Sequence, residues 1–343
     1  MTVTNSAGTA VWRGLEYTRP LRVLENWDID EDLHWFLAST FEGACVAVGF
    51  AEVGPISPSV ARWPGIARDL WATSLDRAAY VGAVHATQSS IAAGTVYQAN
   101  VCRILSAPWP PMGTIRGLWQ VLDGVHGAPY SGYVDIPAGW FDELPDGLGI
   151  VSSSPETFLQ RRGPALLSAP IKGTAHTEHE LQPKDRAENL MIVDLMRNDL
   201  AKVSDPGSVA VPKLFAVEPH PGLVHLVSYV ESQLRDGLGW DDIAEQLLPP
   251  GSVSGAPKSS AVRIVAELEG RARGYYCGTF GVARGAFADL AVGIRSFFRV
   301  GERIEFGTGA GITWGSDPEG EWAETELKAS RLLAAAEQRW GTA

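Results

Sequence analysis

The sequence has only three cysteines, Cys45, Cys102 and Cys277, and they lie far apart. An odd number at this spacing argues against a disulfide framework or a zinc site and favours a reducing cytoplasm. Positive charge is also scarce, because 28 lysines and arginines stand against 40 acidic residues, and no basic block of five or more occurs. The net charge of −12 therefore disfavours binding to nucleic acid or to an anionic membrane surface.

Long apolar runs are missing as well. No stretch approaches the roughly 20 apolar residues that span a bilayer, so we expect no membrane-spanning segment. The opening "MTVTNSAGTAVWRGLEY" lacks a charged region followed by an apolar one, so we expect no secretory leader. No phosphate-binding G-x-x-x-x-G-K-[ST] motif occurs either, which argues against a nucleotide-hydrolysing fold.

What is present is ample core material, with 45% hydrophobic residues in 343, enough for one large domain or two closely packed ones. Apolar periodicity predicts helices at 78–94, 185–203, 259–270 and 320–340 and strands at 95–105, 149–162, 223–234, 275–285, 289–300 and 303–314. In the second helix, Leu190, Val193, Met196 and Leu200 are expected on one buried face. The middle, 106–147, reads as loop-rich. Strands and long helices without regular alternation predict an α+β fold.

Two pairs of carboxylates stand three residues apart near the start of predicted helices. The pairs are Asp185 with Glu188, and Glu321 with Glu324. This spacing puts each pair on one helical face, and two such faces together would suit Mg²⁺, which keeps several waters and takes one or two carboxylates. The alternative is that both pairs are solvated acidic first turns that the helix dipole favours.

A few ionisable residues stand in unusual surroundings. Lys172 lies in "SAPIKGTAHTEHE", where it is either a surface lysine or a positioned amine. Arg295 lies within the apolar run "LAVGIRSFF" and is either an edge residue or a clamp for a carboxylate. His225 in "LVHLVS" is expected to be a core histidine, and His176 and His179 are expected to be solvated.

Two glycine-rich stretches complete the pattern. "PPGSVSGAPKSS" runs into a predicted helix, where free backbone N–H groups can hold an anion. "FGTGAGITWG" (306–315) would let a ligand approach the backbone closely, although glycines also mark bulges and turns.

Taken together, the motifs resemble the chorismate-binding enzymes, a family that includes anthranilate synthase, aminodeoxychorismate synthase, isochorismate synthase and salicylate synthase. The matching stretches follow the family's order over residues 78–335: "YQANV", "SSPETFL", "PIKGT", "DRAENLMIVDLMRNDL", "HLVS", "PPGSVSGAPK", "YCGTFG", "DLAVGIRS" and "GTGAGITWGSDPEGEWAETELKA". The resemblance implies large antiparallel β-sheets packed with helices in an α/β sandwich. It also implies a short β-rich region at 1–75 packed on a chorismate-binding catalytic domain at 76–340.

The same resemblance implies roles for individual residues. The residues implied in catalysis are Lys172, Glu156, His225 and Thr174. The residues implied in substrate binding are Arg295, Lys328, Tyr276, Gly309, Gly311, Ser254 and Gly255. The implied Mg²⁺ ligands are Glu188 and Glu324, with Asp185 and Glu321 as outer or alternative ligands. Glu156 would be the general acid on the departing C4 hydroxyl.

Lys172 discriminates among members of the family. Anthranilate synthases have "PIAGT" at this point, whereas "PIKGT" is typical of aminodeoxychorismate synthases, in which the lysine attacks C2 of chorismate before ammonia adds at C4. The resemblance then implies a separate class I glutamine amidotransferase that supplies the ammonia. The segment between "PIKGT" and "DRAEN" is shorter than usual for that type. The alternatives are an anthranilate-type synthase and a non-catalytic paralogue that binds chorismate or an amidotransferase.

Overall fold

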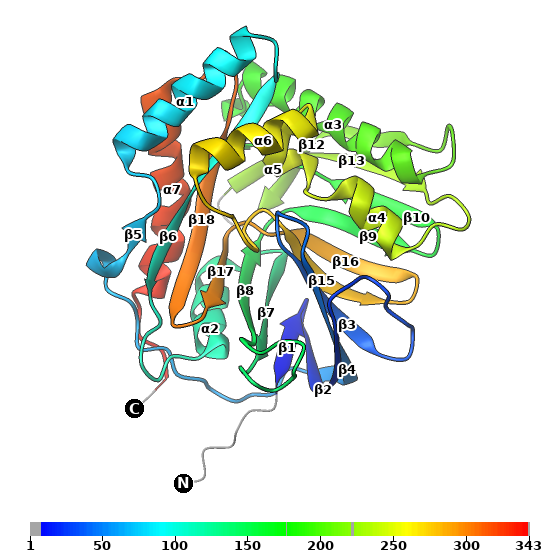
Figure 1. Ribbon diagram of the computed structural model, residues 1–343, viewed down its shortest axis with the longest axis vertical. Coiled ribbons are helices and arrows are strands. Elements are labelled where there is room, and N and C mark those ends of the chain that lie inside the picture. Colours follow the sequence, from blue (N-terminus) through cyan, green and yellow to red (C-terminus); the bar gives the residue numbers. More distant parts are fainter. Residues whose placement is uncertain (1–7, 176, 221–222, 342–343) are drawn as a thin grey trace.

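The computed structural model describes residues 8–175, 177–220 and 223–341, and its strands form one hydrogen-bonded network with helices packed around it (Figure 1). The pairings between strands in these residues are antiparallel, from the β1–β2 hairpin to the long β6–β18 ladder. Helices α1 and α7 flank β6 and β18, α3 packs against β13, and α4 packs against α3. The predicted α+β fold of antiparallel sheets and helices is confirmed.

The strands are β1 (Thr9–Trp12), β2 (Leu15–Leu24), β3 (His34–Ser39), β4 (Cys45–Pro55), β5 (Ala72–Thr73), β6 (Gln98–Pro108), β7 (Tyr130–Ile136), β8 (Leu148–Ser154), β9 (Thr157–Arg162), β10 (Ala165–Ala169), β11 (Ile171–Ala175), β12 (Ala210–His220), β13 (Leu223–Gln233), β14 (Gly255–Ala256), β15 (Thr279–Arg284), β16 (Phe287–Val292), β17 (Ser296–Val300) and β18 (Arg303–Ile312).

The α-helices are α1 (Arg77–Ala92), α2 (Ile115–His126), α3 (Pro183–Val203), α4 (Trp240–Leu247), α5 (Gly251–Ser254), α6 (Lys258–Glu269) and α7 (Pro318–Ala336). The short 3₁₀ helices are η1 (Arg68–Leu70) and η2 (Glu178–Glu180).

The strands connect in one series when they are followed through their pairings. The series runs β6, β18, β17, β8, β7, β1, β2, β4, β3, β15, β16, β9, β10, β13 and β12, and β11 also pairs with β13. The N-terminal strands therefore belong to the same network as the rest, through the β1–β7 and β3–β15 ladders. The boundary at residue 75 between two regions stays a prediction.

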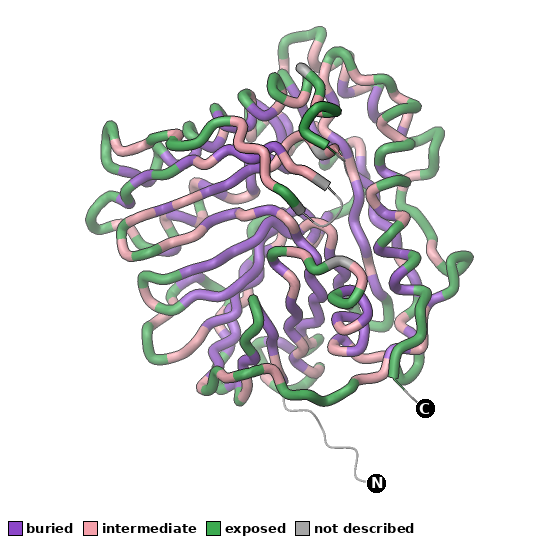
Figure 2. Tube along the Cα trace, turned by 180° about the vertical axis from the view of Figure 1, so that it is seen from behind, coloured by how far each residue is buried: buried purple, intermediate pink, exposed green. Residues whose placement is uncertain are grey.

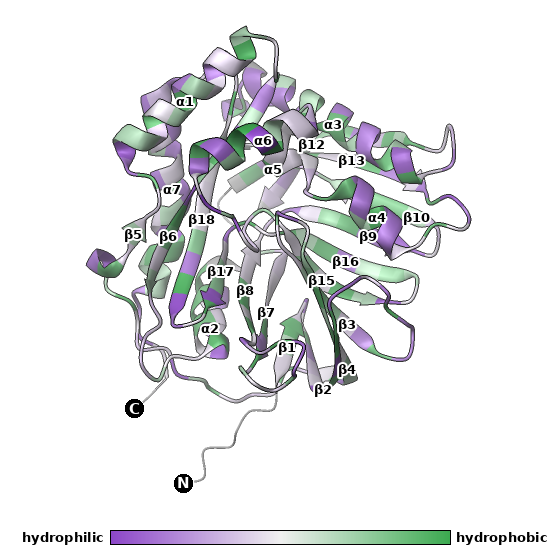
Figure 3. Ribbon diagram, viewed as in Figure 1, coloured by the Kyte–Doolittle hydropathy of each residue, from purple (hydrophilic) through white to green (hydrophobic). Residues whose placement is uncertain are grey.

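The core runs along the strands. Trp12 packs edge-to-face against Phe36 and Phe280, with ring centroids 5.9 and 6.0 Å apart, so strands from both ends of the chain share one apolar cluster. Buried residues follow the strands in Figure 2, whereas the outer helix faces and the loops are exposed. In Figure 3, β3 and β4 are mostly hydrophobic, and α4 and α6 carry hydrophilic residues beside hydrophobic ones. None of the helices in the described ranges is long and apolar enough to span a membrane.

Two expectations about local structure are wrong. The middle of the chain is not loop-rich, because it contains α2 and β7. Helix α2 begins after Thr114, whose hydroxyl accepts a hydrogen bond from the Gly117 amide, and ends at Gly127 in the left-handed region, so both ends carry ordinary helix signals. The predicted strand at 289–300 is two strands, β16 and β17, separated by a bend at 293–295 in which Arg295 has a φ of 53°.

The buried face of α3 also differs from the prediction. Val193, Met196 and Leu200 are buried, but Leu190 is 52% exposed, and Asn189 takes the inward position instead. The Asn189 amide donates to the Leu226 carbonyl oxygen at 3.1 Å, which ties α3 to β13. On a helix of 100° per residue, position 189 lies closer than 190 to the centre of the stripe through the other three.

Candidate active site

Lys172 lies on β11 and is half-buried. Burial lowers the pKa of its ammonium, and the neighbouring charge of Lys328 lowers it further. The carboxylates of Glu156, Glu188 and Glu324 act in the opposite direction, but the net shift is downward. Lys172 therefore lies within electrostatic reach of one lysine and three carboxylates, which come from α3, α7 and the turn between β8 and β9. It is not an isolated surface lysine.

Glu156 lies in the turn between β8 and β9 and is only 6% exposed. The turn is held by its backbone, because the Glu156 amide donates to Ser154 Oγ at 3.3 Å and its carbonyl accepts from the Val292 amide at 3.0 Å. Burial raises the pKa of the Glu156 carboxyl, and a hydrogen bond with the Ser252 side chain and the charge of Lys172 offset part of the shift. A raised pKa favours the protonated carboxyl, which is the form that a general acid needs.

Helix α7 presents Glu321, Glu324 and Lys328 on one face. Lys328 Nζ lies 2.5 Å from Glu324 Oε1 and donates to the Gly309 carbonyl oxygen at 2.9 Å, so it bridges α7 and β18. Burial alone would raise the pKa of Glu324, but the charges of Lys328 and Lys172 bring it below its usual value. Burial and the carboxylate of Glu324 raise the pKa of Glu321.

Glu188 and Asp185 lie on the first turns of α3. The negative charge of Glu188 contributes to the raised pKa of Glu321, so carboxylates from α3 and α7 face one another. Asp185 Oδ2 accepts a hydrogen bond of 2.7 Å from the Gln182 amide, and this makes it a cap of α3, which the sequence did not reveal. Its place among the Mg²⁺ ligands stays a prediction.

The carboxylates of Glu188, Glu321 and Glu324 suit a hard cation, because they offer only oxygen ligands. No group of three or more His, Cys, Asp or Glu side chains in the described ranges is arranged as a complete metal cage. Mg²⁺ needs only one or two protein carboxylates, because it keeps several of its waters. The like-charged carboxylates of Glu188, Glu321 and Glu324 are close enough to raise a pKa among themselves, and a divalent cation would relieve that repulsion. The donor set therefore fits Mg²⁺.

Arg295 lies in the bend between β16 and β17, and this corrects its predicted position inside one strand. Its Nη1 donates to the Lys328 carbonyl oxygen at 3.0 Å, so its guanidinium lies beside the last site residue of α7. Burial lowers the pKa of Arg295, and the neighbouring Tyr276 and Glu324 offset part of that shift. Tyr276 is itself 5% exposed, and burial raises the pKa of its hydroxyl.

Three glycines on one face of β18 leave room for side chains of its neighbours. A Cβ at Gly307 would come 2.0 Å from the ring of Tyr276, and a Cβ at Gly309 would come 2.5 Å from Cys102 Sγ. A Cβ at Gly311 would come 2.5 Å from Gln98 Nε2. On this face of β18 the side chains of Tyr276, Cys102 and Gln98 therefore pack directly against the backbone.

The segment 249–258 lies beside β6. Gly255 and Ala256 pair with β6, and the Ser254 hydroxyl donates to the Pro250 carbonyl oxygen at 3.1 Å within its own turn. The roles of Ser254 and Gly255 as substrate contacts stay predictions. Ser252 was missed from the sequence, although its side chain contacts Glu156. Lys258 anchors the segment, because its Nζ lies 2.8 Å from Oδ2 of the buried Asp199 of α3.

His225 and Thr174 are directly paired between β13 and β11, so the strand with Lys172 lies against the strand with His225. The side chain of Thr174 and all of His176 lie outside the described residues. His179 is exposed on η2, and this confirms the expectation that it is solvated. The catalytic roles of His225 and Thr174 stay predictions.

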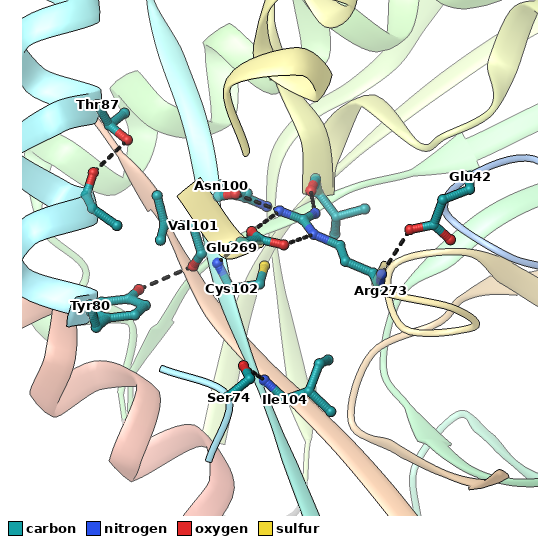
Figure 4. A network of polar contacts seen from close by, with 12 residues as sticks. Glu42, Ser74, Tyr80, Thr87, Asn100, Val101, Cys102, Ile104, Glu269 and Arg273 are labelled. Atoms are coloured by element: carbon teal, nitrogen blue, oxygen red, sulfur yellow. Dashed lines mark hydrogen bonds and ion pairs between the residues drawn. The ribbon is translucent and has the colours of Figure 1, made fainter. Parts of the chain in front are cut away.

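A buried ion pair between Arg273 and Glu269 was also missed from the sequence (Figure 4). Arg273 donates to Glu269 Oε2 at 2.8 Å, to the Asn100 carbonyl oxygen at 2.7 Å and to the Val253 carbonyl oxygen at 3.0 Å. Glu269 Oε1 accepts from the Cys102 amide at 2.9 Å. The pair thus joins α6, β6 and the 249–258 segment. The only sequence signal is the spacing of four residues between the two charges.

The chain is similar in sequence to known proteins. A family model described as chorismate binding enzyme matches residues 59–334. The chain is 36% identical over 280 residues to aminodeoxychorismate synthase component 1 of Klebsiella aerogenes, covering 77% of this chain and 59% of that protein. It is 35% identical over 278 residues to one anthranilate synthase component 1 of Haloarcula marismortui, covering 77% and 55%. The chain thus matches little more than half the length of these relatives.

The fold has a solved counterpart as well. The crystal structure of anthranilate synthase component I from Streptococcus pneumoniae TIGR4 superposes with a TM-score of 0.77 at 19% sequence identity, covering 97% of this chain and 93% of that one. At this identity the likeness concerns the fold alone.

Proposed function

The chain belongs to the family of chorismate-binding enzymes, and from that premise we propose that it converts chorismate and ammonia to 4-amino-4-deoxychorismate through a covalent bond to Lys172. The observation that carries the proposal is the position of Lys172 among Glu156, Glu188, Glu324 and Lys328. A surface lysine would need none of these neighbours, whereas a nucleophilic amine needs a lowered pKa and a nearby acid.

The first step makes the bond to lysine. The neutral Nζ of Lys172 attacks C2, the two ring double bonds shift from C1=C2 and C5=C6 to C1=C6 and C4=C5, and the C4–oxygen bond breaks. Glu156 donates its proton to the departing hydroxyl, which leaves as water, and the proton lost by the lysine nitrogen restores the acid. In the second step the ammonia nitrogen bonds to C4, the two ring double bonds shift back, the Lys172–C2 bond breaks, and one ammonia proton passes to the departing lysine amine.

The pKa shifts have the direction that this chemistry needs. The step requires a neutral amine and a protonated carboxyl in the same molecule. At the ordinary values of 10.5 and 4.5, the difference of six units allows this state in about one molecule in a million. Burial lowers the pKa of Lys172 and raises the pKa of Glu156, so the two values converge, and each unit of convergence raises the competent fraction tenfold.

Cations and the metal would hold the substrate, which is a dianion. Arg295 and Lys328 would bind its carboxylates, together with the backbone at Gly309 and Gly311. A bound Mg²⁺, held by Glu188 and Glu324, would supply positive charge beside the ring carboxylate. The ammonia would come from a separate class I glutamine amidotransferase, a second component that the names of the relatives suggest.

The second candidate is an anthranilate-type synthase, which the 35% identity to the Haloarcula protein favours. The two activities differ in their products, because anthranilate has lost pyruvate and 4-amino-4-deoxychorismate retains it. A third candidate, a non-catalytic binding paralogue, would bind chorismate without turnover.

The deciding experiment incubates the purified chain with chorismate, Mg²⁺ and excess ammonium at mildly alkaline pH and follows the products by mass spectrometry. We expect an amine that retains the pyruvyl group, and loss of this product or redirection to anthranilate in Lys172→Ala. Lys213→Ala, a substitution of an exposed lysine on β12, is the matched control and should leave turnover unchanged. Anthranilate from the wild type would contradict the proposal, and binding without turnover, even with the amidotransferase added, would favour the third candidate.

A further inference from the structure

Arg103 is a buried arginine on β6 whose side chain holds α7, and it is only 2% exposed. Its Nε donates to Thr325 Oγ1 at 3.0 Å, and its Nη2 donates to a carboxylate oxygen of Glu326. Its guanidinium carbon lies 4.2 Å from the centre of the Trp322 ring. Its Nη1 donates to Thr73 Oγ1 of β5 at 3.2 Å. One planar group therefore contacts three residues of α7 and joins that helix to β5 and β6.

The same part of α7 presents Glu321, Glu324 and Lys328, its residues in the proposed site. At 100° per residue, the centre of these three lies roughly a third of a turn from the centre of the three residues that Arg103 contacts. Both sets belong to the same two turns of helix, so a rotation or slide of one set moves the other with it. The carboxylates of α7 face Glu188 of α3, and their direction therefore depends on the rotation of α7.

Net stability does not explain a guanidinium at this position. The loss of hydration of a buried ion offsets most of its attraction to a partner, and an apolar side chain of similar volume is often as stable. The partner carboxylate of Glu326 is itself 50% exposed, which weakens the pair further. What the guanidinium of Arg103 adds is direction, because its donors lie in one fixed planar fork.

We infer that Arg103 is a positioning residue for the metal site, because it fixes the rotation of α7 at which the carboxylates of this helix face Glu188. The inference rests on the Mg²⁺ site of the proposed function. Arg103 acts through α7 and does not itself offer a ligand, since a guanidinium has no acceptor. Its positive charge by itself would repel a divalent cation. Loss of the side chain therefore strengthens metal binding if charge dominates and weakens it if positioning dominates.

The test measures binding of Mn²⁺ to the purified chain without chorismate, from the electron paramagnetic resonance signal of the free ion. Mn²⁺ is the probe because it takes the same oxygen ligands as Mg²⁺. Arg103→Met keeps a similar volume and removes the fork, and we expect the Kd for Mn²⁺ to rise roughly tenfold. Arg77→Met is the matched control. Arg77 Nε also pairs with a carboxylate of α7, that of Glu319 at 2.8 Å, but both side chains are exposed, so the Kd should stay the same.

A second variant separates position from charge and covers the case in which Arg103→Met fails to fold. Arg103→Lys keeps the positive charge but lacks the planar fork, so it should also raise the Kd. Circular dichroism identifies the variants that are folded, so that a rise in Kd does not reflect unfolded chain.

Three results would overturn the inference. They are a Kd that is unchanged or lower in Arg103→Met, a Kd that Arg103→Lys restores to the wild-type value, and a wild type that binds no Mn²⁺. Anthranilate as the product of the wild type would instead contradict the proposed function and leave this inference standing, because Mn²⁺ binding is measured without turnover.

Discussion

Replacing Arg273 by methionine should destabilise the protein by about 4 kcal/mol, because it removes one partner of a buried ion pair. The side chains of Arg273 and Glu269 are 2% and 5% exposed and lie 2.5 Å apart. The guanidinium also donates to the Asn100 and Val253 carbonyl oxygens at 2.7 and 3.0 Å. Methionine fills a similar volume, so the cost comes from the unpaired Glu269 carboxylate and the two carbonyl oxygens rather than from a cavity.

The assay is urea unfolding followed by tryptophan fluorescence, with a thermal scan beside it. For a chain of 343 residues, 4 kcal/mol corresponds to a fall in Tm of about 5 °C. Arg271→Met is the matched control, because the side chain of Arg271 is 37% exposed and pairs with Glu305 near the surface. Its cost should stay below about 1 kcal/mol.

A double variant separates charge from packing. Arg273→Met combined with Glu269→Gln leaves no unpaired charge, and the glutamine oxygen can still accept from the Cys102 amide. We expect the double variant to cost about 2 kcal/mol, less than Arg273→Met alone. The reasoning is refuted if Arg273→Met costs no more than Arg271→Met, or if the second substitution adds to the loss.

Three further predictions concern the site. Burial raises the pKa of Glu156 and lowers the pKa of Lys172, so the acidic limb of the pH profile of kcat/KM should lie above pH 4.5 and its basic limb below pH 10.5. A profile with its limbs at those two ordinary values would contradict the pKa shifts. Glu188→Gln should raise the Mg²⁺ concentration for half-maximal activity at least about tenfold in a metal titration, and an unchanged titration would remove Glu188 from the ligands. Gly307→Ala should cost about 1–3 kcal/mol in urea unfolding, since its Cβ would meet the Tyr276 ring, and a neutral result would mean that the ring moves freely.

Local patterns predicted most of the secondary structure. Alternation and apolar periodicity located β8, β9, β13, α1, α3 and α7 to within a few residues, because these signals depend on near neighbours in the chain. The bend at Arg295 was missed, since a single residue with a φ of 53° leaves no trace in an apolar run that continues on both sides. Helix α2 was missed although Thr114 and Gly127 mark its ends, because Pro108, Pro110 and Pro111 just before it predict a loop.

The site illustrates the same division. The sequence identified Lys172, Glu156, Glu188, Glu324 and Lys328 through motifs in four separate segments, and the structure brings the other four within electrostatic reach of Lys172. Their roles remain predictions. No role for Ser252 or for the Arg273–Glu269 pair followed from the sequence, because a serine or an arginine in a loop has no distinctive pattern until its neighbours are known.

The sequence by itself determined the fold class, the family and the set of chemical groups, since motifs and periodicity are properties of the chain alone. Only the tertiary structure decided which groups are buried, which lie side by side and in which direction their pKa values move. Desolvation and Coulomb interaction depend on distances through space, and β8, β11, β18, α3 and α7 come together only when the antiparallel network closes. The lowered pKa of Lys172 is therefore a property of the folded molecule.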